Sequence, residues 1–393
     1  MFSTAAPLFA QAADKDEIIQ KLLDRVDALE REVATLQKAQ VQPAPAVSQP
    51  APQPTIENTT VAPADNASRF TFHSYADAGF LRNENGNDTK KFSLGEIDLF
   101  ATSRISTHFT ALMEVAFETN SQALVADVPI DVERLLLQYR GSDFFNADIG
   151  SYRTALGYYS TAFLRGSWLQ TAISRPKMFN FEDDGGFLPL HATGVSINGR
   201  LPSGSINLHY VVEMGSSRNY GNTSGLGLEP SFNNATNLAL SSQPRGIPGL
   251  EIGFSTYHDR YSPVAGFWLN RSVWMVHFVY VRGRVEFLNE GLFIGTHDQL
   301  GGVGTGLGFY SQIAYRIASS WKPYARVEYL NAYGTGDESP SISRQYSPWQ
   351  TVYTGGVRYD LTENVALKAE VGRETDYLRP SFISSAIQLA FTF

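Results

Sequence analysis

A two-residue side-chain period runs from residue 69 to the C-terminus, and it limits the possible folds more than any other feature of the chain. Apolar residues alternate with small or polar ones in short segments that are separated by turn-forming residues. Because successive side chains of a strand point to opposite faces, the pattern predicts half-buried β-strands. We expect sixteen strands, near residues 69–81, 92–103, 107–119, 130–140, 143–152, 190–201, 204–214, 233–243, 250–259, 272–282, 284–294, 306–318, 321–332, 349–360, 364–374 and 383–393. Segment 233–243 alternates least clearly, and we include it in part because the others need an even partner.

The last of these segments needs a partner strand. One of its faces is mostly apolar and consists of Ile383, Ser385, Ile387, Leu389, Phe391 and Phe393. In a soluble sheet this strand would be an apolar edge and an aggregation hazard, whereas in a membrane barrel it pairs with the first strand. The ending also resembles the terminal signature of bacterial outer-membrane proteins. That resemblance implies that Phe391 and Phe393 form an assembly signal for the barrel-assembly machinery.

Composition agrees with an all-β transmembrane barrel and excludes several other classes. The chain is 43% hydrophobic, with a mean hydropathy of -0.19 and no cysteine. No run approaches the roughly 18 consecutive apolar residues of a membrane-spanning helix. The lack of cysteine excludes disulfides and thiolate metal sites. The net charge of -8 argues against nucleic-acid binding, and we find no pattern for a metal or cofactor site.

Connection lengths separate the strand ends into two groups. The short connections are 105–106, 141–142, 202–203, 244–249, 283, 319–320 and 361–363. The long connections are 82–91, 120–129, 153–189, 215–232, 260–271, 295–305, 333–348 and 375–382. Short periplasmic turns and long extracellular loops are typical of barrels in the bacterial outer membrane. We therefore expect residues 69–393 to contact outer-membrane lipid.

Two irregular segments are expected before the barrel. Residues 1–13 end in an A-x-A pattern without a positive n-region, and we interpret them as a truncated signal peptide; a plain disordered N-terminus is the alternative. Residues 42–68 are rich in proline and alanine, which favours an extended polyproline linker.

Between them, residues 14–41 carry a heptad pattern. Its a and d positions are Ile19, Leu22, Val26, Leu29, Val33 and Leu36. Three heptads are too short to be stable alone, so an attached oligomer is needed. Arg25 and Glu30 resemble the signature of trimeric coiled coils, which implies a homotrimer with a periplasmic helix. The a and d residue types alone favour a dimer, and a single amphipathic helix docked on its own domain is a further alternative.

The alternation assigns side chains to the two faces of the barrel. Those expected to face lipid include Phe70, Phe72, Ile97, Leu99, Phe109, Met113, Val115, Phe117, Ile206, Leu208, Tyr210 and Val212. Those expected to face the lumen include His73, Asp77, Glu96, Asp98, His108, Glu114, Glu118, Arg134, Arg140, Asp148, His209, Glu213, Glu251, Glu286, Glu290, Arg326, Glu328, Arg358, Lys368 and Glu370. A charged side chain on the lipid face costs about 2 to 4 kcal/mol for Arg or Lys, so charges belong inside. A polar interior within sixteen strands is an aqueous channel.

The longest connection, residues 153–189, is the candidate pore constriction. Its charged residues are Arg153, Arg165, Arg175, Lys177, Glu182, Asp183 and Asp184. The segment is also too rich in aromatic residues to remain free in water. Folded inward, it would set opposite charges across the lumen and orient dipolar solutes. The alternative is an extracellular lid.

The coiled coil with its spacer, the sixteen strands and the stretch G-S-Y-R-T-A-L-G-Y-Y together resemble putative porins related to the phosphate-selective porins O and P. This resemblance implies a passive diffusion channel for small hydrophilic solutes or ions. Phosphate-selective members have an arginine-rich constriction and a lysine ladder. Here the strand-borne interior carries twelve acids against five bases, so we expect a general to mildly cation-preferring porin.

Two other functions remain as alternatives. The periplasmic helix and linker could tether the outer membrane to peptidoglycan, with the barrel as anchor. A hydrolase could use His258 with Asp259 or His297 with Asp298, but adjacent strand residues point to opposite faces and cannot form a dyad. We therefore expect no enzyme activity. The glycine-dense stretch 301–308 is interpreted as a flexible loop without a nucleotide site.

Overall fold

The computed structural model describes residues 70–83, 89–118, 130–180, 186, 188–217, 235–264, 267–331, 349–377 and 380–393. The expected signal segment 1–13, coiled coil 14–41 and linker 42–68 lie outside this part of the chain, as do Glu182, Asp183 and Asp184. Within it, no helix has the length and hydropathy needed to cross a membrane.

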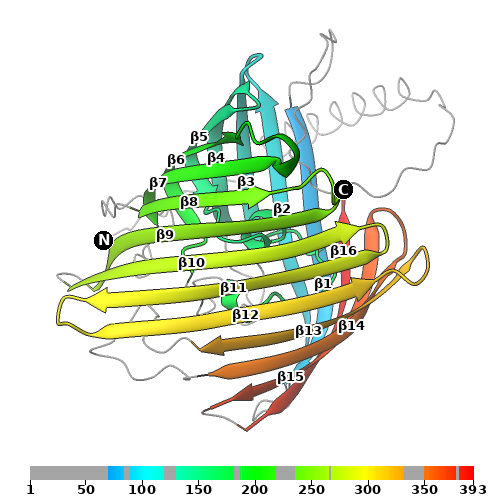
Figure 1. The fold of residues 1–393 in the computed structure, drawn as a ribbon. Coiled ribbons are helices and arrows are strands. Elements are labelled where there is room, and N and C mark those ends of the chain that lie inside the picture. Colours follow the sequence, from blue (N-terminus) through cyan, green and yellow to red (C-terminus); the bar gives the residue numbers. More distant parts are fainter. Residues whose placement is uncertain are drawn as a thin grey trace, which may run out of the picture. The chain divides into compact units, whose positions relative to one another are not determined.

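The described residues form a closed antiparallel barrel in which each strand pairs with its sequence neighbours and the last pairs with the first (Figure 1). Its strands are β1 (Phe70–Asn83), β2 (Thr89–Arg104), β3 (Phe109–Glu118), β4 (Ile130–Ser142), β5 (Phe145–Arg153), β6 (His191–Arg200), β7 (Leu208–Ser217), β8 (Ala235–Ser242), β9 (Leu250–Val264), β10 (Phe267–Arg282), β11 (Val285–Asp298), β12 (Val303–Tyr315), β13 (Trp321–Asn331), β14 (Gln350–Asp360), β15 (Val365–Asp376) and β16 (Phe382–Thr392). Within these described ranges, three short helices lie in connections: α2 (Tyr159–Ala162), η1 (Lys177–Phe179) and η3 (Gly204–Ile206). The predicted sixteen-strand barrel is confirmed.

Backbone hydrogen bonds at the C-terminus close the barrel. The amide of Ser74 donates to the carbonyl of Phe393 at 3.0 Å, and the amide of Phe393 donates to Ser74 at 3.1 Å. Ile387 and Leu389 of β16 are exposed on the outer face, while Gln388 between them is buried and bonded to Asp77. The apolar face of the last strand therefore points outward, and its edge is fully paired.

Two β-bulges change which side chains face inward. In β2, Gly95 and Glu96 together lie opposite Asp77. In β4, Glu133 is the extra residue beside the pair formed by Glu114 and Arg134. A bulge shifts the side-chain alternation by one position, so two successive residues can face the same side. Both bulges place additional charge inside the barrel.

The prediction of long loops at residues 260–271 and 295–305 is wrong. Strands β9 and β10 continue on either side of residues 265–266, and β11 and β12 are separated only by residues 299–302. Proline and glycine suggested turns here, but long-range strand pairing determined the structure. The glycine-dense stretch consequently runs into β12, where Gly308 packs so closely that an added Cβ would lie 3.0 Å from Leu330 Cδ1.

Candidate functional site

The long connection after β5 packs against the inner wall of the barrel. Leu156, Leu164 and Phe179 from this segment are completely buried, and so are Leu188 and Leu190 before β6. Their contacts are with inward-facing side chains of β9 to β13. The described part of this segment, residues 154–180, 186 and 188–190, thus occupies the lumen, and we call it the inner loop.

Apolar packing holds one side of the inner loop. Val273 and Met275 of β10 and Leu288 of β11 face inward and join the loop's buried cluster. Within it, Tyr159 of α2 stacks on Phe179 with ring centroids 5.0 Å apart. Burial raises the pKa of the Tyr159 hydroxyl, which therefore stays protonated. An inward apolar surface would be unfavourable in an open aqueous pore, and the loop removes it from water.

Carboxylates on the wall accept hydrogen bonds from the loop backbone. Glu290 of β11 accepts the amides of Tyr158 at 2.6 Å and Tyr159 at 2.8 Å. Glu370 of β15 accepts two consecutive amides, those of residues 173 and 174, at 2.9 and 3.2 Å. Glu213 accepts from Ala155 and Glu328 accepts from Lys177 in the same way. Charged acceptors make strong hydrogen bonds, so these acids fix the path of the loop.

Cations on the wall donate to loop carbonyls. Arg358 of β14 donates to Trp168 at 2.5 Å and to Gln170 at 3.0 Å. Lys368 of β15 donates to Ser167 and Ala172, at 2.5 and 3.2 Å. A further bond of 2.8 Å joins Arg326 of β13 to the carbonyl of Ser174.

These contacts change the meaning of the predicted lumen charges. Glu290, Glu328, Glu370, Arg326, Arg358 and Lys368 do face inward, but all are buried under the loop. Their charges are engaged by loop backbone groups and by one another. The count of twelve acids against five bases therefore does not measure the field in the remaining pore.

A separate ion cluster holds the loop on β2 to β6. Arg165 of the loop donates to Glu133 at 2.8 Å and also pairs with Glu96. The second carboxylate oxygen of Glu133 is 2.7 Å from His191 Nε2. Beside it, Glu114 pairs with both Arg134 and Arg153. Strict alternation from the inward Arg134 would put Glu133 on the lipid face, but the bulge in β4 brings both residues inside.

The predicted constriction residues fall into different environments. Arg153 and Arg165 are buried in ion pairs with the wall. Lys177 pairs with Glu374 at 2.8 Å and stays about one third exposed. Arg175 is partly buried beside Arg326, which donates to its carbonyl. Asp98 faces inward as expected, whereas the side chain of Glu118 at the end of β3 lies outside the described part.

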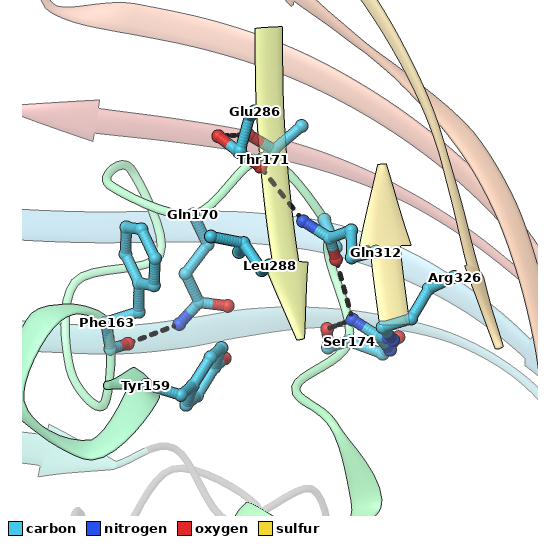
Figure 2. A pocket seen from close by; sticks show the side chains of 10 residues that line it. Tyr159, Phe163, Gln170, Thr171, Ser174, Glu286, Leu288, Gln312 and Arg326 are labelled. Atoms are coloured by element: carbon cyan, nitrogen blue, oxygen red, sulfur yellow. Dashed lines mark hydrogen bonds between the residues drawn. The ribbon is translucent and has the colours of Figure 1, made fainter. Parts of the chain in front are cut away.

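A small cavity remains between the inner loop and β11 to β13. Figure 2 shows its lining, where Thr171 and Gln312 both bond to Glu286, and Arg326 reaches Ser174. Its volume is about 10 Å³, which is room for a single water molecule. A solute path therefore does not run through it.

The His-Asp pairs of the hydrolase alternative are separated. Asp259 faces inward and makes two bonds to Arg271, at 3.1 and 2.7 Å, whereas exposed His258 bonds Ser272 at 2.8 Å. The carboxylate of Asp298 accepts the amides of Leu300 and Gly302 in the turn. Among the described residues, no group of three potential metal ligands comes together.

Comparisons with known proteins find the fold but no relative in sequence. No protein-family model matches the chain, and no curated protein matches it. Solved outer-membrane proteins are similar over nearly their whole length, and the following three are among them. The trimer form of OmpT, an outer membrane protein of Vibrio cholerae, matches with a TM-score of 0.57 and 12% identity, over 82% of this chain and 99% of that chain. The anion-selective porin from Comamonas acidovorans has a TM-score of 0.58 and 12% identity, with coverage of 82% and 99%. The outer membrane channel DcaP of Acinetobacter baumannii has a TM-score of 0.55 and 10% identity, with coverage of 82% and 97%.

The chain has the outer-membrane porin fold. Identities of 10 to 13% relate folds alone, so neither the solute nor the selectivity of those proteins carries over.

Proposed function

We propose that this protein is a passive diffusion channel of the bacterial outer membrane for small hydrophilic solutes or ions, with the inner loop as its constriction. The observation that carries the proposal is the closed barrel whose lumen is crossed by a loop bonded to β7, β11, β13, β14 and β15. A barrel of this size needs an ordered internal element to sort solutes.

The chain contains no cysteine, which allows a direct test. Thr161 is exposed on α2 of the inner loop, and Thr305 is exposed on the outer face of β12. In planar bilayers, a bulky thiol reagent should lower the conductance of the Thr161→Cys variant and leave that of Thr305→Cys unchanged. A protein without conductance, or equal responses of the two variants, would overturn the proposal.

For ion preference, we propose a general channel with a mild preference for cations. The formal net charge of -8 supports this, because an excess of acidic groups attracts cations to the channel. Reversal potentials in a salt gradient test it, and a clear anion preference would sink this part of the proposal. We also propose that the chain is related to the porins of the O and P group.

We further propose a homotrimer whose periplasmic coiled coil, residues 14–41, joins three barrels. The solved OmpT structure described as a trimer form supports this assembly. Single-channel closures should come in threes. Deleting residues 14–67 should leave conductance intact; loss of envelope integrity with normal solute uptake would instead favour the peptidoglycan tether as the main role.

We also propose that Phe391 and Phe393 are the assembly signal. Phe391 lies on the outward side of β16, and Phe393, which directly follows this strand, is 67% exposed. Removing Phe393 should lower outer-membrane yield, and a normal yield would count against recognition by the barrel-assembly machinery.

A further inference from the structure

A row of hydrogen-bond donors crosses the outer face of the barrel on β9 to β11. Arg260 is the cross-strand neighbour of Asn270, and Asn270 is the neighbour of His297. All three side chains are exposed. These three residues, which we call the outer donor row, come from adjacent strands, so their side chains lie close together. Figure 1 shows β9, β10 and β11 side by side.

The outer donor row lies at the boundary of the apolar belt. The next outward row toward the periplasmic end contains His258 and Ser272, and the row after it contains Trp274 and Phe293, whose rings are 5.6 Å apart. The donors lie at the rim opposite the end where Phe393 closes the barrel. In an outer-membrane barrel this is the level of the outer-leaflet headgroups.

An aromatic contact holds the arginine of this row. The guanidinium carbon of Arg260 lies 4.9 Å from the ring centroid of Trp268, which is itself partly exposed. Such a contact restricts the side chain while leaving its N–H groups available to a second partner.

Acidic groups are absent from this surface. None of the outward-facing residues of β9 to β12 in the described part is an aspartate or glutamate. The acids next in sequence, Asp259 and Asp298, are buried on the inner side, where Arg271 and turn amides engage them. In sequence, the residues between these strands, 265–266 and 299–302, include no acid either. The surface is therefore complementary to an anion.

We propose that the outer donor row binds the phosphate group of a phosphorylated glycolipid in the outer leaflet. The guanidinium fork of Arg260 pairs with two phosphate oxygens, and the Asn270 amide and the His297 imidazole supply further N–H donors. The acyl chains of the same lipid lie on Trp274 and Phe293. This inference rests on the placement of the barrel in the outer membrane and not on the channel activity.

Native mass spectrometry of the full-length protein in non-ionic detergent tests the proposal. The probe is a diphosphorylated, acylated glucosamine disaccharide, compared with the same lipid after removal of both phosphates. We expect phosphate-dependent retention of the lipid, weakened roughly tenfold by Arg260→Gln and partly restored in Arg260→Lys. Asn270→Ala and His297→Gln should each weaken retention by a smaller factor.

Arg373→Gln is the matched control. Arg373 is an exposed outward arginine of β15, but its cross-strand neighbours are Tyr353 and Ile383, so it lacks flanking side-chain N–H donors. Equal retention of the dephosphorylated lipid, an equal loss in the Arg373→Gln variant, or no loss in Arg260→Gln would overturn the proposal. Tight binding of inorganic phosphate that displaces the lipid would also overturn it, in favour of a free-anion site. Unchanged conductance of Arg260→Gln shows that the variant is folded and separates this result from the channel proposal.

Discussion

Two walls of the barrel hold the inner loop by different means. The apolar wall, on β9 to β13, buries Val273, Met275 and Leu288 against loop side chains and uses carboxylates to accept loop amides. The charged wall, on β2 to β6, binds the loop through ion pairs between side chains, of which Arg165 with Glu133 is the most buried.

The two walls differ in how strongly their contacts depend on the amino-acid sequence of the loop. A carboxylate can accept the backbone amide of any residue except proline. The apolar wall therefore holds the backbone of the loop in place without depending on its side chains. A buried ion pair requires a specific partner, because a charge left alone in the interior is strongly unfavourable. The charged wall therefore fixes the register of the loop, and the apolar wall provides the area that it buries.

The largest effect should come from Arg165→Ala. It leaves Glu96 and Glu133 without the guanidinium group that joins them, and removing one partner of a buried pair costs about 3 to 5 kcal/mol. Urea unfolding in lipid vesicles measures the loss of stability. The double variant Arg165→Met with Glu133→Gln should recover a large part of it. A single variant as stable as the parent would show that the charged wall does not hold the loop.

Leu288→Ala should have the next largest effect, at about 2 to 5 kcal/mol, since Leu288 is only 2% exposed and its truncation leaves a cavity. The register of the inner loop against the barrel wall should remain unchanged in this variant. Limited proteolysis should therefore cut the loop at the same sites as in the parent, only faster. Leu307→Ala, on the outer face of β12, is the control and should not affect the loop. New cleavage sites in Leu288→Ala would mean that the apolar wall also fixes register.

The barrel itself was predictable because alternation is a local signal. The pairing of β16 with β1 followed from the apolar face that ends at Phe393. The inner loop's contacts were not predictable in the same way. Glu290 could face water or a loop amide, and Arg358 could face water or a loop carbonyl. Which of these occurs depends on pairs more than one hundred residues apart.

The bulges did leave a signal that simple alternation misses. In β4 the outward apolar residues are Ile130 and Val132, then Leu135 and Leu137, so the phase shifts by one residue at Glu133. The same shift occurs in β2 at Gly95 and Glu96, between Leu94 and Ile97. Apolar side chains on both faces of β10 were a second signal, because an inward Val273 or Met275 needs a cover.

Glu290→Gln should weaken the apolar wall moderately, by about 1.5 to 3 kcal/mol, because an amide replaces a charged acceptor of two loop amides and of the Tyr310 hydroxyl. Hydrogen exchange at Tyr158 and Tyr159 should become faster. Ser311→Ala, on the outer face of β12, is the control. Exchange rates equal to those of the parent would show that backbone capture by Glu290 does not order α2.

The smallest effect should come from Arg134→Gln, at about 1 kcal/mol. The Arg134 side chain is 23% exposed, and Glu114 keeps its second partner, Arg153, after the substitution. The variant also loses the contact of Arg134 with the Phe100 ring, 5.7 Å away, which contributes little at a partly exposed site. Unfolding in urea should therefore separate it clearly from Arg165→Ala. If the two variants lose equal stability, the ion pairs of β2 to β6 act as one cooperative network, and the charged wall fixes register through all its arginines together.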